Sequence, residues 1–271
     1  MYEKVLVVAS RKDKAGMNIA SHLTQIGCSD ICFVEGDMVY TEDLDLDILN
    51  SADFVIFASK HVSESGEKTL SVHAPGNWRS ADLGGFRGKV CKTSALFMKQ
   101  IFDRLDKNVK KFNLNNYKVT LEVTHHGPLI DKPCLFIEIG SSENEWSDRK
   151  AGFVISKTII ETIKNFEDNS HNEVAIAIGG PHYCPSFNNI QLKSNVAISH
   201  IIPQYTFPLT EEMVEEAIKK TDEEVDMILL SWKGLGNAER RDEVMRTLDK
   251  FNIQKRKTSE IVCSHQTYVT P

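Results

Sequence analysis

Residues 4–34 read KVLVVASRKDKAGMNIASHLTQIGCSDICFV, and this stretch decides the fold. The apolar run at 4–9 predicts a buried strand, the apolar spacing over 14–26 predicts a helix that ends at Gly27, and 31–34 predicts a second strand. A helix that connects two short apolar strands is typical of a β-α-β unit with parallel strands. The chain therefore opens as an α/β protein.

Outward from this unit, strands and helices continue to alternate. Two stretches, 60–85 and 179–208, are rich in Gly, Pro and polar residues and are predicted to be mainly loops. Further strands are predicted at 53–58, 117–124, 134–139, 174–178 and 227–231, and further helices at 93–111, 143–166, after Thr210 and at 237–251. We expect an α/β fold with a mixed, largely parallel sheet and helices on both faces.

The composition is that of a globular protein. The 271 residues are 41% hydrophobic and 26% charged, and no repeat or linker-like segment interrupts them, so we expect a single domain over 1–271. The longest apolar runs are far shorter than the roughly 18 residues of a membrane span, so no membrane association is expected. The N-terminal region lacks the features of a signal peptide, which favours a cytoplasmic location.

Cysteine usage and charge narrow the class further. The six cysteines have no paired spacing, which suits a reducing compartment, and we expect free thiols. The net charge of −6 gives no overall attraction to nucleic acid, although the stretch 84–111 is locally basic. Taken alone, that stretch is either the solvated face of a helix or a binding patch. No protein partner is implied, and we expect a monomer.

Several common motifs are missing from the sequence. No G-x-x-x-x-G-K-[ST] occurs, and the GLG at 234–236 lacks the third glycine of a dinucleotide site. Cys28 and Cys32 have no second cysteine pair that would complete a zinc knuckle. Neither Ser141 nor Ser231 lies in a G-x-S-x-G context. Nucleotide-cofactor and serine-hydrolase chemistry therefore have no support.

Histidines carry the strongest functional signal. His125 and His126 stand together after a predicted strand, directly before a Gly-Pro turn. His182 follows another predicted strand and two glycines, and His73 and His200 lie in or beside predicted loops. Because ligand-binding groups of α/β sheets gather at strand ends, the pair and His182 are predicted to be functional rather than structural.

Such a cluster has two chemical interpretations. Neutral imidazoles with a carboxylate are the usual ligands of a zinc ion that keeps one position open for water, and Glu122 or Glu138 can supply the carboxylate or act as a general base. A metal-free alternative uses one histidine as general base and another, or Lys60, to stabilise the developing oxyanion. Both interpretations point to hydrolysis.

Three segments combine these features: VTLEVTHHGP at 119–128, FIEIGSSENEW at 136–146 and IGGPHYCP at 178–185. Together they resemble the D-aminoacyl-tRNA deacylases of the type found in archaea and plants. Further likeness runs through 59–61, 70–77, 200–202 and 232–235, so the resemblance covers nearly the whole chain in order.

The resemblance implies hydrolysis of the ester between a D-amino acid and the terminal adenosine of tRNA. It also implies a bound Zn²⁺ and an α/β core similar to the phosphorylase and peptidyl-tRNA hydrolase folds. On this basis the expected metal-binding set is His125, His126, His182 and Glu138, and the expected catalytic set is His126, His182, His73, His200 and Lys60. Trp146 and Tyr183 are candidates for stacking on the terminal adenine.

An acidic chain that binds a polyanion needs a concentrated basic face. We expect tRNA to contact the basic residues of the predicted helix at 93–111, namely Lys99, Arg104, Lys107, Lys110 and Lys111. Two alternatives stay open. One is a related hydrolase or phosphorylase that acts on peptidyl-tRNA or nucleosides, because a similar core would host either activity. The other is a non-catalytic tRNA-binding or metal-storage protein.

Overall fold

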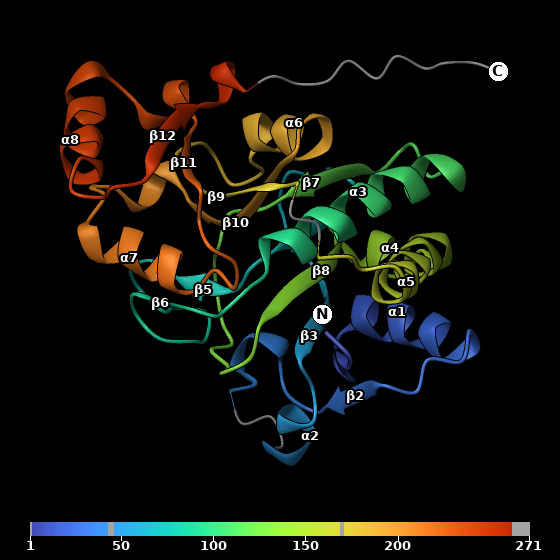
Figure 1. The fold of residues 1–271 in the computed structure, drawn as a ribbon. Helices are drawn as coiled ribbons and strands as arrows, with labels where there is room; N and C mark the ends of the chain where they lie inside the picture. The colour runs from blue at the N-terminus through green and yellow to red at the C-terminus, as the bar shows by residue number, and fades with distance from the viewer. Residues whose placement is uncertain (1, 43–45, 169–170, 262–271) are drawn as a thin grey trace.

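The structure is a computed structural model that describes residues 2–42, 46–168 and 171–261 (Figure 1). A six-stranded sheet has the order β2-β1-β3-β8-β4-β7, and a four-stranded sheet has the order β10-β9-β11-β12. The first comprises β1 (Val5–Ser10), β2 (Ile31–Val34), β3 (Phe54–Lys60), β4 (Thr69–His73), β7 (Lys118–Leu121) and β8 (Cys134–Gly140). The second comprises β9 (Glu173–Ile178), β10 (Val196–Ile202), β11 (Met227–Leu230) and β12 (Gln254–Lys257).

The predicted fold class is confirmed. All neighbouring strands pair in parallel except β4 and β8, which pair antiparallel, and the short hairpin of β5 (Gly76–Asn77) and β6 (Lys89–Val90). The opening β-α-β unit is present as predicted, with α1 (Lys14–Gln25) between β1 and β2. The Asp13 carboxylate accepts a hydrogen bond from the Gly16 amide and fixes the start of that helix.

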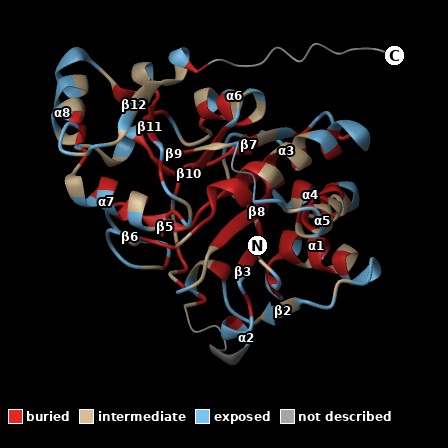
Figure 2. Ribbon diagram, viewed as in Figure 1, coloured by how far each residue is buried: buried red, intermediate tan, exposed pale blue. Residues whose placement is uncertain are grey.

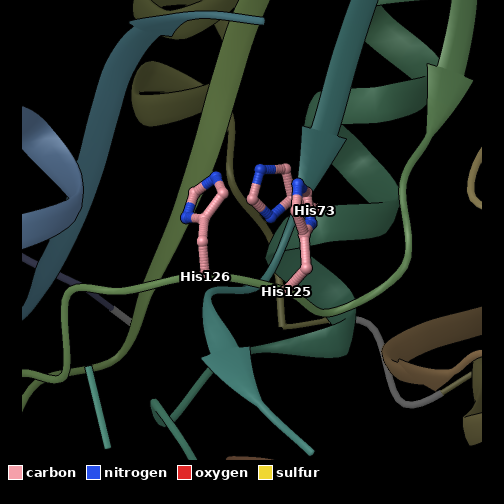
Figure 3. Close-up of side chains that lie close together, drawn as sticks. All are labelled: His73, His125 and His126. Atoms are coloured by element: carbon pink, nitrogen blue, oxygen red, sulfur yellow. The ribbon is translucent and has the colours of Figure 1, made fainter. Parts of the chain in front are cut away.

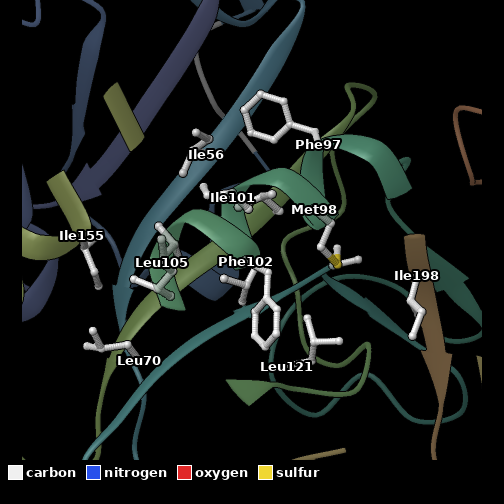
Figure 4. Close-up of a cluster of buried hydrophobic side chains, with 14 of the residues drawn as sticks. Ile56, Leu70, Phe97, Met98, Ile101, Phe102, Leu105, Leu121, Ile155 and Ile198 are labelled. Carbon is white, nitrogen blue, oxygen red and sulfur yellow. The ribbon is translucent and has the colours of Figure 1, made fainter. Parts of the chain in front are cut away.

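Helix α3 (Ala95–Lys111) lies between the two sheets and supplies much of the core (Figure 4). Its apolar side chains belong to one buried cluster with Ile56 of β3, Leu70 of β4, Leu121 of β7 and Ile198 of β10. Figure 2 shows the burial concentrated along the central strands and on the inward sides of the helices. The core therefore holds both sheets against a single helix.

The remaining helices cover the outer faces. The α3 side of the first sheet also carries α1 and α5 (Arg149–Lys164), whereas its other side is covered by loops, by the 3-10 helix η1 (Met38–Tyr40) and by α2 (Leu46–Asn50). The second sheet packs against α6 (Pro185–Lys193), α7 (Glu211–Lys219) and α8 (Ala238–Leu248). None of the described helices is long and apolar enough to cross a membrane.

The structure corrects several predicted elements. The stretch 60–85 contains β4, which separates β7 from β8, and the stretch 179–208 contains α6 and β10. The predicted helix at 143–166 is divided into α4 (Glu143–Trp146) and α5, because the Asp148 carboxylate caps a new helix by accepting from the amides of Lys150 and Ala151. The five described cysteines are free thiols, and Cys263 lies outside the described residues.

Candidate active site

Imidazole and carboxylate side chains from five separate stretches meet over one face of the six-stranded sheet. They are His61 directly after β3, His73 at the end of β4, Glu122, His125 and His126 after β7, Glu138 within β8, and His182 after β9. We call these seven residues the His/Glu centre. They lie on the sheet face that points away from α1, α3 and α5, because Glu138 shares its side of β8 with Cys134 and Phe136.

A cavity of about 470 Å³ opens beside this centre, and we call it the first cavity. His61, His125, His126, Glu138 and His182 line it on one side. Its other lining residues come from the carboxyl ends of β1 and β3, from the start of α1, from η1 and its neighbours, and from the loop between β5 and β6: Ser10, Asp13, Asp37, Met38, Val39, Tyr40, Ser59, Lys60, Val62 and Leu83. Ligand sites of α/β sheets gather at such strand ends.

Glu122 is the most strongly contacted carboxylate of the centre. His182 Nε2 donates to its Oε2 at 2.8 Å, and His61 Nδ1 lies 3.1 Å from its Oε1. Its side chain is fully buried, and burial alone would raise the pKa. The hydrogen bonds from His182 and His61 outweigh that effect and hold the pKa of Glu122 well below its usual range, so the carboxylate is charged at neutral pH.

Glu138 occupies the middle of β8, directly between Ser59 of β3 and Ser71 of β4. Its Oε2 lies 3.6 Å from both His61 Nδ1 and His73 Nε2. Burial would raise its pKa, but these two imidazoles prevail and lower the pKa of Glu138. The centre therefore holds two ionised carboxylates that are both shielded from bulk water.

Two histidines balance this negative charge. Burial disfavours the protonated form of His61, yet Glu122 and Glu138 outweigh burial and raise the pKa of His61 to about 11. His73 is fully buried, and Glu138 raises its pKa in the same way. Buried carboxylates are stable only when compensated by nearby positive charge, and His61 and His73 supply that charge here.

The other imidazoles of the centre behave in the opposite way. Burial, followed by the charge of His73, lowers the pKa of His126 to about 4 and lowers the pKa of His125 well below its usual value. Both side chains are therefore neutral at physiological pH. A neutral imidazole is the form that ligates a metal ion or accepts a proton.

The ring orientation of three histidines is fixed by the backbone. Nδ1 of His73, His125 and His126 lies 3.2, 2.8 and 2.6 Å from the carbonyl oxygen of a residue one or two positions away. Because a carbonyl only accepts, each Nδ1 carries the hydrogen and Nε2 is left for other partners. The three rings gather at one place (Figure 3). One nitrogen atom from each of the three rings can be chosen so that all three nitrogens lie within 4.8 Å of one another.

A tight turn places the His125–His126 pair. His126 has φ 44°, in the left-handed region, and Gly127 follows it. A Cβ at Gly127 would lie 2.4 Å from both the Gly85 amide nitrogen and the Val39 carbonyl oxygen, so only glycine fits there. The segments that contain Val39 and Gly85 therefore pack directly against this turn.

The structure holds atoms that suit a metal ion. The donor set is imidazole and carboxylate, which zinc prefers in proteins. His73 Nε2 is buried without a hydrogen-bond partner among the described residues. Three overlapping groups lie close enough to hold an ion: His73 with His125 and His126, His61 with Glu122 and His182, and His73 with Glu122 and Glu138. The predicted set of His125, His126, His182 and Glu138 is thus divided among these groups.

Other predicted residues lie at different distances from the centre. Lys60 lines the first cavity, with its Nζ 5.6 Å from the Trp146 ring. His200 is fully buried outside that cavity, with Nδ1 3.3 Å from Thr124 Oγ1 and Nε2 3.2 Å from the Lys220 carbonyl oxygen. His200 thus supports the segment that leads into His125 rather than facing the cavity.

Sequence reasoning missed His61 as a site residue, although it follows a buried apolar strand as the other candidates do. The two predicted stacking residues hold it in place. Trp146 Nε1 donates to the His61 carbonyl oxygen at 3.0 Å, and the Tyr183 hydroxyl lies 2.8 Å from His61 Nε2. Their polar atoms therefore serve the centre directly.

The five predicted tRNA-binding residues lie on α3, and none of them lines a described cavity. Lys99 is buried and bonds to the Gln191 carbonyl and to Asp103. Arg104 donates to the Glu161 carbonyl oxygen at 2.6 Å. Lys107, Lys110 and Lys111 are exposed at the end of the helix.

The sequence profile of the D-aminoacyl-tRNA deacylase family matches residues 48–255, which include every member of the His/Glu centre. The chain belongs to this family. A relative named D-aminoacyl-tRNA deacylase from Methanocaldococcus jannaschii is 33% identical over 246 residues, which cover 88% of this chain and 93% of the relative. Another from Thermococcus kodakarensis is 37% identical and covers 73% of each chain.

A solved structure agrees with the family assignment at the level of the fold. The crystal structure of a conserved protein of unknown function, AF0625, superposes with a TM-score of 0.86 and 30% sequence identity. The match covers 95% of this chain and 96% of that protein. Nearly the whole fold of this chain is therefore shared with that protein.

Proposed function

We propose that this protein hydrolyses the ester bond of D-aminoacyl-tRNA and releases free tRNA and a D-amino acid. The observation that carries the proposal is the His/Glu centre itself, in which the ionised carboxylate of Glu138 and several imidazoles line a cavity large enough for an aminoacyl group. Membership of the deacylase family supports the substrate class.

We further propose that the centre binds a zinc ion. Nε2 of His73, His125 and His126 would hold it, because the backbone carbonyls keep the hydrogen on Nδ1 in each ring. Zinc would displace the second proton of His73 and take over its role of compensating the carboxylates. Glu122 and Glu138 neighbour this group and would compensate the positive charge. A bound zinc ion would supply a Lewis acid that lowers the pKa of a water molecule to about 7 and polarises the ester carbonyl.

The side chains of the chain itself divide the proton transfers. Glu138 is ionised and lies at the edge of the first cavity, so it accepts the proton of the attacking water. His61 stays protonated beside both carboxylates and places positive charge near the developing oxyanion. His182 is more exposed than His61 and is held by Glu122, so it delivers a proton to the departing ribose oxygen. Lys60 lines the same cavity and orients the aminoacyl group.

The deciding experiment measures release of amino acid from D- and L-aminoacylated tRNA, each with and without a chelator. We expect release from the D-form, little from the L-form, and loss of release after chelation that added zinc restores. Bound zinc, measured by atomic absorption in the purified protein, gives an independent readout of the metal. Absence of release from D-aminoacyl-tRNA would refute the activity, whereas release that survives complete metal removal would refute only the zinc.

A further inference from the structure

A second cavity of about 290 Å³ adjoins the first cavity at His125. His125 is shared by the linings of both cavities, so the two meet at the His/Glu centre. The remaining lining residues of the second cavity come from the segment around β5, from the segment that follows β7, and from the 3-10 helix η2 (Gln204–Thr206). They are Gly76, Asn77, Trp78, Arg79, Ser80, Thr124, Tyr205 and Thr206.

Tyr205 is an exposed aromatic side chain in the lining of this second cavity. It is 60% exposed, and its ring stacks on no aromatic ring among the described residues. Burial of the hydroxyl end, together with nearby Cys184 and Glu122, raises the pKa of Tyr205 to about 12. The ring is therefore largely open to solvent, and its hydroxyl stays neutral at physiological pH.

Arg79 fixes the position of this tyrosine. Its Nε and Nη2 donate at 2.6 Å to the carbonyl oxygens of Thr206 and Pro208, which follow Tyr205 in the chain. The amide of Gln204 donates to the Gly180 carbonyl in the loop that carries His182. An exposed aromatic ring and a guanidinium are thus held rigidly next to the catalytic imidazoles.

The first cavity has a different chemical character. Its walls carry the carboxylates of Asp13 and Asp37, and its rim carries the exposed apolar side chains of Tyr40, Val62 and Leu83. Carboxylates suit the α-ammonium group of an amino acid, and an apolar rim suits a variable side chain. An aromatic face with an arginine suits a base and its phosphate instead.

An ester joins two groups, and the centre that would cut it borders two cavities. We propose that the second cavity binds the 3′-terminal adenosine of the tRNA, with the adenine on the Tyr205 ring and Arg79 next to the nucleotide phosphate, while the D-aminoacyl group enters the first cavity. This inference rests on the proposed deacylation, which defines the two sides of the bond.

The test uses the full-length protein with Tyr205→Ala, Tyr205→Phe and, as the matched control, Phe33→Ala, which removes an exposed aromatic ring that lines neither cavity. Inhibition by adenosine 5′-monophosphate and by the free D-amino acid is measured against D-aminoacyl-tRNA. Tyr205→Ala is expected to raise KM and the inhibition constant of the nucleotide roughly 5- to 150-fold, the range of one lost base stack, with kcat within a few-fold. The inhibition constant of the D-amino acid should stay unchanged, and Tyr205→Phe should behave like the parent protein.

Arg79→Lys provides a second test, because it keeps the charge but loses the planar fork. It is expected to weaken inhibition by the nucleotide more than inhibition by adenosine, a difference that a purely structural role would not produce. A Tyr205→Ala variant with normal nucleotide inhibition, or one that loses D-amino acid inhibition instead, overturns the assignment. A parent protein that releases no amino acid refutes the deacylation, and direct nucleotide binding by calorimetry then still decides whether Tyr205 holds a base.

Discussion

The His/Glu centre and the basic helix α3 both concentrate charge, but they neutralise it in different ways. On α3, Lys110 pairs with Asp106 one helical turn away at 2.6 Å, and Lys110 is exposed to solvent. In the centre, Glu122 and Glu138 are shielded from water, and their compensation comes from histidines on other strands. The charge of Lys110 is therefore satisfied within its own helix, whereas the charges of the centre depend on the complete fold.

This difference decides what each region can do. An exposed pair at i,i+4 contributes only about 0.3–0.5 kcal/mol, so its lysine is free to exchange a carboxylate for a phosphate at little cost. A buried carboxylate that loses its partner is far less tolerable, because its charge stays desolvated. The centre is thus suited to chemistry and α3 to reversible contact with a polyanion.

The largest expected effects come from substitutions in the His/Glu centre. Replacing His126 or His182 by Ala is expected to lower kcat by a factor of about 100 or more, because general acid-base and metal catalysis each contribute at least that much. Glu138→Gln removes the proposed proton acceptor while it keeps the shape of the side chain, and should fall in the same range. Single-turnover release of amino acid from D-aminoacyl-tRNA measures the effect.

His22→Ala is the matched control, because His22 lies on α1 against Phe153 and lines no described cavity. It should leave kcat within a few-fold of the parent. Near-normal turnover in the His126 and His182 variants together would remove these imidazoles from the mechanism.

A second expectation concerns acid stability and sharpens the contrast between buried and exposed charge. Burial lowers the pKa of His200 from 6.5 to about 4. Between about pH 4 and pH 6.5, His200 is protonated in the unfolded chain but neutral in the native state. The free energy of unfolding therefore falls as the pH falls through this window, and it is constant above the window. From pH 7 to pH 5 the loss is about 2 kcal/mol for this group.

Urea unfolding at pH 7 and pH 5 measures this loss. His200→Asn keeps a polar side chain in the same place but cannot titrate, so its stability should decline less between the two pH values than that of the parent. Changing lysines of α3 should leave the decline as it is, because lysines do not titrate in this range. Equal declines in the parent and His200→Asn would show that His200 contributes nothing to acid sensitivity.

A third expectation tests how the loops hold the centre. Gly127→Ala would force a Cβ against the Gly85 amide and the Val39 carbonyl, so the turn that carries His126 must move. We expect a loss of about 1–3 kcal/mol in stability, the usual cost of overpacking, and a fall in kcat. Gly36→Ala is the control, since a Cβ there meets nothing within 4 Å. Thermal unfolding and turnover, measured on both variants, should separate them clearly.

Local pattern predicted the opening β-α-β unit and most later elements, but it missed β4. That strand has only two apolar side chains on its core side, Leu70 and Val72, while Thr69, Ser71 and His73 alternate on the other side. A five-residue strand with three polar members amid Gly and Pro has no apolar run to find. Its antiparallel pairing with β8 is a tertiary choice that no local signal records.

The sequence predicted most of the residues of the candidate site, but it did not predict which of them contact one another. The strand-end rule found His125, His126 and His182, because each follows a predicted strand, whereas His73 was placed in a predicted loop and entered the expected site through the family resemblance. His200 entered with it, although its strand belongs to the second sheet and its Nε2 lies 3.2 Å from the Lys220 carbonyl oxygen. Which carboxylate meets which imidazole depends on β4 inserting between β7 and β8, so the sequence offered Glu122 and Glu138 without showing that both are shared.

The smallest expected effect tests the other side of the comparison, the exposed end of α3. Changing Lys107, Lys110 and Lys111 together to Glu should raise KM for D-aminoacyl-tRNA roughly tenfold at physiological salt and leave kcat unaltered, because these residues touch no reacting atom. The slope of log KM against log salt should fall by about one for each phosphate that the variant no longer neutralises. Changing Lys219, Lys233 and Lys250 to Glu produces the same net charge elsewhere on the surface and should leave that slope intact. If both triple variants raise KM equally, the effect is one of overall charge, and α3 is not the tRNA-binding face. If neither variant raises KM, tRNA is held at the two cavities, and the lysines of α3 are only the solvated side of a core helix.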